Sequence, residues 1–136
     1  MPRKEIASGT AAEASWIVKG ADLASALSDG HASSFPEVFA TARMIALMEL
    51  AAARVLVPLL EPGELSVGVS IDARHTAATP PGAKVTARAV YRGMEGKFYR
   101  FDVEAFDPGG AIGSAVHDRA IISVERLLAA ARKRIG

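Results

Sequence analysis

Three polar side chains interrupt otherwise apolar patterns in this chain: Thr41, Glu49 and His75. Glu49 is the one carboxylate within the apolar run of residues 44–60. At about 100° per residue, its neighbours on a helical wheel are alanine, isoleucine and leucine, and no basic residue shares their face. An unpaired carboxylate buried there would be costly and would have a raised pKa. The pattern therefore predicts that Glu49 has a partner elsewhere in the chain.

His75 is the candidate partner, because it ends a segment in which apolar and polar residues alternate. It shares a face with Leu65, Val67, Val69, Ile71 and Ala73, the face expected to cover the helix. We therefore expect Glu49 to meet His75 and to orient an imidazole that acts as general base and acid. Thr41 lies about 12 Å from Glu49 along a helix axis, and an imidazole that bridges two oxygens spans about 8 Å. A Thr41–His75–Glu49 set is thus within reach.

Each of these residues also has a structural alternative. Glu49 could be a snorkelling or interface residue, and His75 a satisfied core histidine. Thr41 could be the N-cap of the helix. Metal binding is disfavoured, because Glu49 and His75 with no third ligand nearby make a poor site.

The helix that would carry Thr41 and Glu49 is predicted over residues 37–57, which are rich in alanine, leucine and methionine. Pro58 and the turn at 61–63 end it. A short strand is expected at 16–18 and a short helix at 21–27, after a loose tail at 1–10. The chain closes with a short basic helix at 125–134.

Turn signals divide the rest of the chain into strands. The turns are TPPG (79–82), GMEG (93–96) and DPGG (107–110), and the strands are 65–76, 83–91, 97–106 and 111–124. Four strands with short turns predict an antiparallel meander. The long helix spans about 31 Å and a ten-residue strand about 33 Å, so one helix can lie along the whole sheet. With the N-terminal strand, this is an α+β hot-dog fold: a five-stranded antiparallel sheet wrapped around one helix.

Composition restricts the class of protein further. The 136 residues, half of them apolar, suit a single domain over 1–136. A net charge of +1, with basic residues scattered among acidic ones, does not make the basic stripe of a nucleic-acid binder. The chain has no cysteine, and its N-terminus has no apolar segment of a signal peptide. The run at 44–60 is short for a membrane span and contains charges and Pro58. We expect a cytoplasmic protein without a membrane partner.

Several motifs, in order and at matching spacing over about residues 35–126, resemble the fluoroacetyl-CoA thioesterase family of hot-dog enzymes. They are FPEVFAT (35–41), LME (47–49), LEPGE (60–64), HTAATPPG (75–82), IGS (112–114) and HDRA (117–120). The resemblance implies a homodimer that hydrolyses an acyl-CoA, with CoA as part of the substrate and no other cofactor. It implies catalytic roles for Thr41, Glu49 and His75. It also implies that Phe35 lies at the mouth of the acyl pocket, Gly68 near the acyl group, and Arg119 in a histidine-acid-arginine motif.

The chain departs from the family pattern in residues 1–34, and Ala32 stands where the fluoroacetyl-specific enzyme has a bulky aromatic residue. A short, ordinary acyl group is therefore the expected substrate class. Alternation on the last strand puts Arg119 and His117 on the face opposite Ile112 and Val116. Arg119 would then lie at a subunit interface, on a CoA phosphate, or in a solvated pair with Asp118.

Three functions remain open at this level. The first is a thioesterase in which the start of the long helix stabilises an oxyanion and His75 transfers protons. Thr41 would attack the carbonyl or hold the water that does, and Glu49 would orient His75 or attack the carbonyl itself. The second is a non-catalytic acyl-CoA-binding module. The third is a hot-dog hydratase or dehydratase that acts on the acyl chain.

Overall fold

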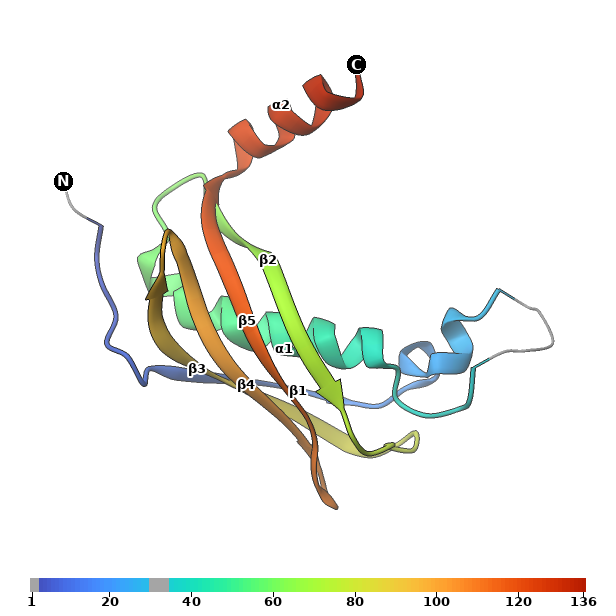
Figure 1. The fold of residues 1–136 in the computed structure, drawn as a ribbon. Coiled ribbons are helices and arrows are strands. Elements are labelled where there is room, and N and C mark those ends of the chain that lie inside the picture. The colour runs from blue at the N-terminus through green and yellow to red at the C-terminus, as the bar shows by residue number, and fades with distance from the viewer. Residues whose placement is uncertain (1–2, 30–34) are drawn as a thin grey trace.

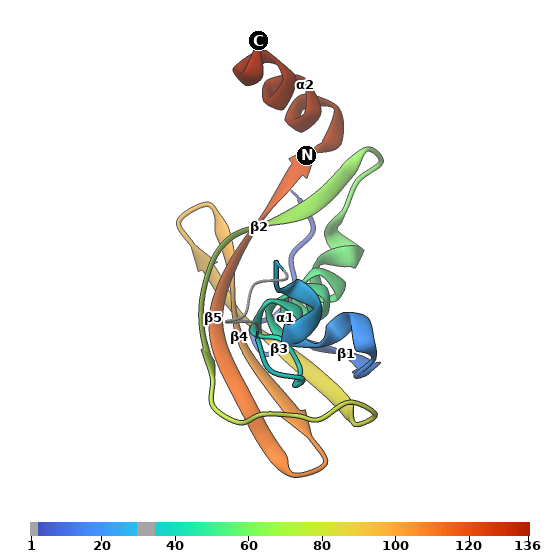
Figure 2. The ribbon, with the colours of Figure 1, turned by 90° about the vertical axis from the view of Figure 1, so that its right-hand side faces the viewer.

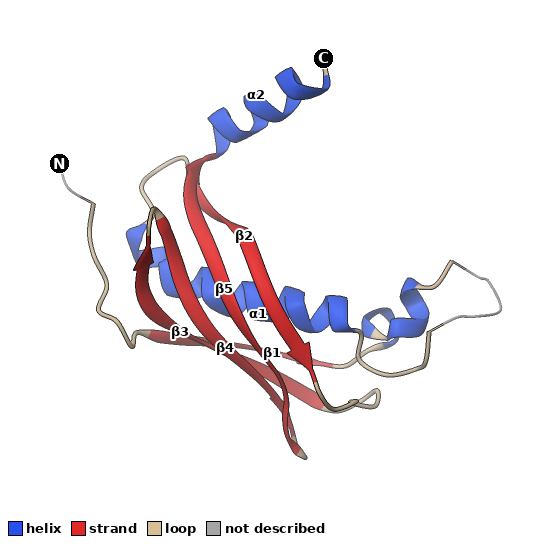
Figure 3. Ribbon diagram, in the orientation of Figure 1, coloured by secondary structure: helices blue, strands red, loops and turns tan. Residues whose placement is uncertain are grey.

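One long helix lies against a curled antiparallel sheet in the computed structural model, which describes residues 3–29 and 35–136 (Figures 1 and 3). The strands are β1 (Ala11–Ile17), β2 (Glu64–His75), β3 (Lys84–Glu95), β4 (Phe98–Asp107) and β5 (Gly110–Ser123). The helices are α1 (Thr41–Leu56) and α2 (Val124–Ile135), with short 3₁₀ helices η1 (Gly20–Asp22), η2 (Ala24–Leu27) and η3 (Val57–Leu59). The predicted α+β class, with a five-stranded sheet around one central helix, is confirmed.

The helix α1 is held by an apolar stripe that faces the concave side of the sheet. Its buried residues recur at helical spacing: Met44, Leu47, Met48, Ala51, Ala52, Val55 and Leu56. They pack against small and branched residues of β3 and β4, among them Ala87, Ala89 and Val103, which are almost fully buried. Figure 2 shows the sheet curving around α1. Small side chains on the sheet allow this close approach, so the position of α1 is fixed along its whole length.

The strand order, β1-β3-β4-β5-β2, corrects the predicted continuous meander. The turns after β3 and β4 are tight and use glycines in the left-handed region, Gly96 and Gly110. The segment 76–83, which contains the TPPG motif, instead carries the chain from β2 at one edge to β3 on the other side of β4 and β5. It is fastened to the body by the buried Thr79, which donates a hydrogen bond to Asp107 at 2.7 Å. The prediction of a hairpin at TPPG was therefore wrong.

The remaining element boundaries differ modestly from expectation. The long helix begins at Thr41 rather than near residue 37, and Pro58 lies in η3 directly after it. The helix expected at 21–27 is the pair η1 and η2, and the first strand is longer than predicted. Residues 3–10 form no helix or strand, but Arg3 makes two hydrogen bonds of 2.7 Å to Glu64, at the start of β2.

The faces of β2 and β5 are set by irregularities that the sequence pattern did not reveal. The register of β2 against β5 shifts between Gly68 and Ser70, so the residues before this bulge face the opposite way from the predicted pattern. Leu65 and Val69, predicted to cover the helix, are 55% and 46% exposed. Gly68 faces α1 instead.

A second shift, between β4 and β5, lies at Ala105 and Phe106. As a result the predicted faces of β5 are exchanged: Val116 is 44% exposed, whereas His117 and Arg119 are buried on the side of α1. Polar side chains of β2 and β5 therefore lie on the face of the sheet that packs against α1.

Both edges of the sheet, the outer sides of β1 and β2, and the last helix have no partner in the described part of the chain. No strand there pairs with the outer edge of β2. The helix α2 stands clear of the body at the end of β5, and none of its residues is buried (Figure 1). None of the described helices is long and apolar enough to cross a membrane.

Candidate active site

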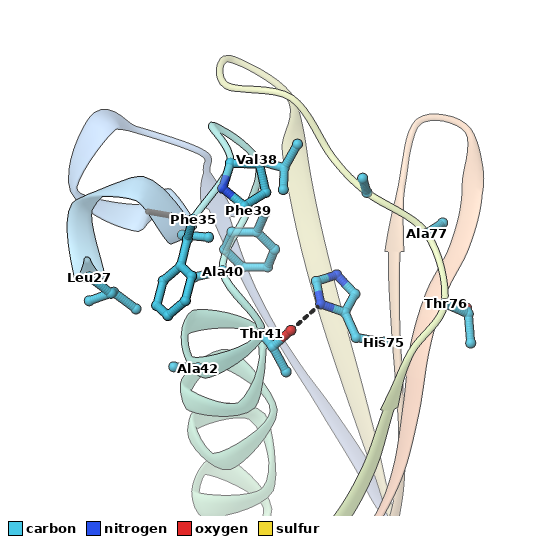
Figure 4. Close-up of a pocket in the computed structure, with 13 residues that line it drawn as sticks. Leu27, Phe35, Val38, Phe39, Ala40, Thr41, Ala42, His75, Thr76 and Ala77 are labelled. Atoms are coloured by element: carbon cyan, nitrogen blue, oxygen red, sulfur yellow. Dashed lines mark hydrogen bonds between the residues drawn. The ribbon is translucent and has the colours of Figure 1, made fainter. Parts of the chain in front are cut away.

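Thr41 and His75 form a hydrogen-bonded pair where α1 begins and β2 ends (Figure 4). Thr41 is the first residue of α1 and His75 the last residue of β2, and Oγ1 of Thr41 lies 2.7 Å from Nδ1 of His75. Burial lowers the pKa of His75, which favours the neutral imidazole. A neutral imidazole can accept the threonine proton at Nδ1, provided that Nε2 carries the hydrogen. The pair is thus arranged as an activated hydroxyl and its base.

The other ring nitrogen of His75 has no protein partner in the described structure. Nε2 is buried and makes no hydrogen bond of ordinary geometry with residues 3–29 or 35–136, although the backbone of Ala77 is close enough to the ring to raise its pKa against the effect of burial. A buried N–H without an acceptor is costly and marks a position where another group is expected. This atom is therefore available for a carboxylate, a water molecule or substrate.

The start of α1 beside this pair has no side-chain cap. Its N-cap residue is Ala40, which cannot accept a hydrogen bond from the first turn through its side chain. The leading N–H groups of a helix have no acceptor within the helix, and they lie at the positive end of its dipole. Thr41 is not the N-cap, and its hydroxyl is directed to His75. The N–H of Arg43 already donates to the carbonyl of Ala40 at 3.0 Å, so among the described contacts the N–H groups of Thr41 and Ala42 are the ones left to bind an anion or an oxyanion.

A cavity of about 540 Å³ opens at this helix start. Thr41 and His75 supply polar groups to a wall that is otherwise mostly apolar and includes Leu27, Phe35, Val38, Phe39 and several alanines. Phe35 is 54% exposed, which agrees with a place at the rim of the cavity. Ala32, the predicted departure from the family pattern, lies outside the described residues. No cluster of histidine and carboxylate residues in the described ranges could hold a metal ion.

A second polar cluster lies farther along α1. Nη1 of Arg119 donates to Oε1 of Glu49 at 3.3 Å, and the guanidinium is almost completely buried. Ser66 accepts from the same guanidinium twice, at 3.0 Å through its hydroxyl and at 2.9 Å through its carbonyl. The Glu49 side chain is 42% exposed, so one side of this carboxylate is open. Glu49 therefore has a partner from outside its own helix, as predicted, but the partner is Arg119 of β5 rather than His75.

The structure does not bring Glu49 and His75 together within one chain. Glu49 lies against Gly68, and His75 is seven residues farther along β2, roughly 20 Å away for an extended strand. Of the predicted set, Thr41 and His75 meet, whereas Glu49 meets Arg119. The predicted alternative of a solvated Arg119–Asp118 pair was also wrong, because Arg100 binds Asp118 at 2.9 Å.

His117 is the member of this cluster that sequence reasoning missed as a candidate. Its Nε2 lies 3.2 Å from Nη1 of Arg119, and its Nδ1 lies 2.8 Å from the carbonyl oxygen of Ser70. The spacing of two between His117 and Arg119 places both on one face of a strand. That spacing could have identified His117 as a partner of Arg119. The sequence pattern assigned both residues to the wrong face of β5, because it does not reveal the register shift at Ala105 and Phe106.

Comparison with known proteins identifies the family of the chain. The family model for the fluoroacetyl-CoA-specific thioesterase FlK matches residues 18–125. The fluoroacetyl-CoA thioesterase of Streptantibioticus cattleyicolor is 48% identical over 102 residues, which are 75% of this chain and 73% of that protein. The chain belongs to this family. The resemblance inferred from the motifs is confirmed, and with it the predicted class of enzyme, a thioester hydrolase.

Solved structures place the fold in the same group. A crystal structure of a FlK variant superimposes with a TM-score of 0.88 at 39% identity, over 97% of this chain and 99% of that one. A hot-dog-like protein from Thermanaerovibrio acidaminovorans matches with a TM-score of 0.81 at 25% identity, over 95% of this chain and 93% of that one. The hot-dog prediction is confirmed by these neighbours.

In this member of the FlK family, Gly68 leaves the space that Glu49 occupies. A Cβ on Gly68 would clash with Oε1 of Glu49 and would lie 3.2 Å from Cε1 of His117. We expect Gly68→Ala to displace the carboxylate and to lower kcat by about tenfold or more, since small misplacements cost large factors in rate. The measurement is steady-state thiol release, with circular dichroism to verify the fold. Parent activity in a folded Gly68→Ala variant would show that the position of Glu49 does not matter.

Proposed function

We propose that this protein hydrolyses the thioester of a short-chain acyl-CoA and releases the free acid and CoA. The observation that carries the proposal is the Thr41–His75 pair, which lies beside an uncapped helix start and opens into an apolar cavity. A relative named as a fluoroacetyl-CoA thioesterase supports the substrate class. So does a FlK variant solved with fluoroacetate and CoA, 40% identical over 90% of this chain, with a TM-score of 0.83.

The chemistry follows from the two side chains. His75 accepts a proton at Nδ1, either from the hydroxyl of Thr41 or from a water molecule that Thr41 holds. The resulting oxygen nucleophile forms a bond to the carbonyl carbon, and the negative charge moves to the carbonyl oxygen. The free N–H groups at the start of α1 stabilise that oxyanion. The carbon–sulfur bond then breaks, and the proton on His75 passes to the CoA thiolate. If Thr41 attacks, water hydrolyses the resulting ester by the same base.

A homodimer would join the two polar clusters, which one chain keeps apart. The outer edge of β2 has no partner among the described strands, and such edges favour pairing with another chain. Antiparallel pairing of two copies of β2 puts the His75 end of one strand beside the Glu64–Gly68 end of the other. Glu49 lies against Gly68 and is open on one side. It would thereby approach the partner's His75, whose Nε2 lacks an acceptor. We therefore propose two sites, each built from both subunits.

Mixing two inactive variants tests this arrangement directly. A heterodimer of a His75→Ala subunit and a Glu49→Gln subunit contains one site in which both residues are intact. Refolding the two variants together should therefore restore about a quarter of parent activity, from the random pairing expected in a two-fold dimer. Each variant refolded alone is the control. Sedimentation should give a dimer at micromolar concentration. No recovery from a mixture of dimers, or a monomer in sedimentation, would contradict the shared site.

A thiol-release assay on a panel of acyl-CoAs tests the activity itself. The panel contains acetyl-, fluoroacetyl-, propionyl-, butyryl- and crotonyl-CoA at equal concentration. Faster release than the uncatalysed rate, with a preference among the short saturated chains, supports the proposal. Tight binding without release would indicate a binding module, and hydration of crotonyl-CoA without release would indicate a hydratase.

A further inference from the structure

The hydrogen bonds of His117 fix both its tautomer and its charge. The carbonyl of Ser70 only accepts, so Nδ1 of His117 must carry a hydrogen to bond at 2.8 Å. Arg119 only donates, so Nε2 of His117 must present its lone pair to Nη1 at 3.2 Å. A second proton on the ring would set two N–H groups against each other. The neutral Nδ1–H form is therefore the one that satisfies both contacts.

The guanidinium that His117 contacts is held on several sides. Nη1 of Arg119 is shared between His117 and Glu49, while its Nε and Nη2 bind Ser66. Arg119 is 6% exposed, and its stem cannot move without breaking these bonds. The ring of His117 is in turn packed beside Phe101, at 6.4 Å between centroids. The contacts form one chain from Ser70 through His117 and Arg119 to the carboxylate.

We propose that His117 is a positioning residue that acts through Arg119 to hold Glu49 in place for the reaction. The inference rests on the proposed function, because it needs Glu49 to take part in hydrolysis. His117 itself does not contact the cavity beside Thr41. Its role is to accept one hydrogen of Nη1, which aims the other at Oε1 of Glu49. The bulge after Gly68 contributes by placing the Ser70 carbonyl where Nδ1 can reach it.

The charges around His117 keep this arrangement intact at neutral pH. Burial lowers the pKa of His117 and Arg119 lowers it further, whereas the hydrogen bond to the Ser70 backbone and the charges of Glu49 and Asp118 act in the opposite direction. The ring stays neutral above this lowered pKa. Below it, an imidazolium would repel Arg119 and free Glu49. The same protonation opposes folding, because a histidine with a lowered pKa binds its proton more readily in the unfolded chain.

Replacing His117 with asparagine or with glutamine tests its two hydrogen bonds one at a time. In His117→Gln the amide oxygen can stand where Nε2 was and accept from Arg119. In His117→Asn the shorter amide can reach the Ser70 carbonyl but not Arg119. We expect His117→Asn to lower kcat by about tenfold or more with little change in KM, and His117→Gln to recover most of the loss. Asp102→Asn is the control, because this exposed carboxylate on β4 binds Arg92 and contacts neither His117 nor Arg119 among the described contacts.

A double variant shows whether the effect passes through Glu49. Glu49→Gln with His117→Asn should be no slower than Glu49→Gln alone, since residues that act as one unit are not additive. If Glu49→Gln is slow but His117→Asn has the parent rate, or if the two losses multiply, the positioning role is overturned while the proposed function stands. If Glu49→Gln has the parent rate, the role proposed for Glu49 fails and this inference fails with it. Nitrogen NMR should show His117 as a neutral Nδ1–H ring; the other tautomer would also overturn the proposal.

Discussion

Replacing His75 with alanine lowers kcat for thioester hydrolysis by about a hundredfold or more, the usual contribution of a positioned base. His75 is the only group within hydrogen-bond distance of the Thr41 hydroxyl among the described contacts, so its loss leaves that hydroxyl without a base. The fold should persist, because Ile71 and Ala73 still pack the strand against the core. Thermal melting and thiol release on the same preparation check both statements.

The pH dependence of the parent enzyme adds a second measurement to this prediction. Burial lowers the pKa of His75, so the neutral base survives to lower pH than an exposed histidine would allow. Activity should fall as the pH drops through that lowered pKa. The pH–activity profile of His75→Ala should lack this fall. Arg74→Gln is the control, since Arg74 precedes His75 on β2 but is exposed and pairs with Asp72. A His75→Ala variant with parent activity and only a lower melting temperature would identify His75 as a core residue.

Much of the site was predictable because local patterns are strong there. Thr41 and His75 each stand at the end of a regular element, where the helix period and the strand alternation fix their direction. The class of fold followed from one long helix and evenly spaced turns. Pro58 stopped the helix as expected, because proline cannot continue it.

The side-chain directions on β2 and β5 and the order of the strands could not be predicted, because they depend on interactions between distant segments. A β-bulge moves every residue that follows it to the opposite face of the strand. The alternation of apolar and polar residues around Gly68 gives no sign that a bulge lies there. Two such shifts turned Gly68, His117 and Arg119 toward α1, and this gave Glu49 a different partner from the His75 that was predicted. Likewise TPPG has the composition of a turn, but strand pairing is decided by the sheet as a whole.

Glu49→Gln is the variant with the other large expected effect, and the contacts of Glu49 decide its consequence for stability. A lone buried carboxylate would be relieved by neutralisation. Glu49 instead partners a buried guanidinium, and Arg119 would lose the charge that compensates its own. Because the Glu49 side chain is 42% exposed, the pair is screened, and the cost of the change should be about 1 kcal/mol rather than a gain.

The effect of Glu49→Gln on activity should be much larger than its effect on stability. Glutamine keeps the size of the side chain and an oxygen that can accept from Arg119, so the cluster around Gly68 remains filled. In the proposed dimer, glutamine cannot stabilise the imidazolium that would form on the partner's His75 during proton transfer, and we expect kcat to fall by about a hundredfold or more. Thiol release and thermal melting are measured together, with Glu104→Gln, an exposed carboxylate on β4, as the control. A Glu49→Gln variant that melts lower yet hydrolyses acyl-CoA at the parent rate would reduce Glu49 to the counter-ion of Arg119.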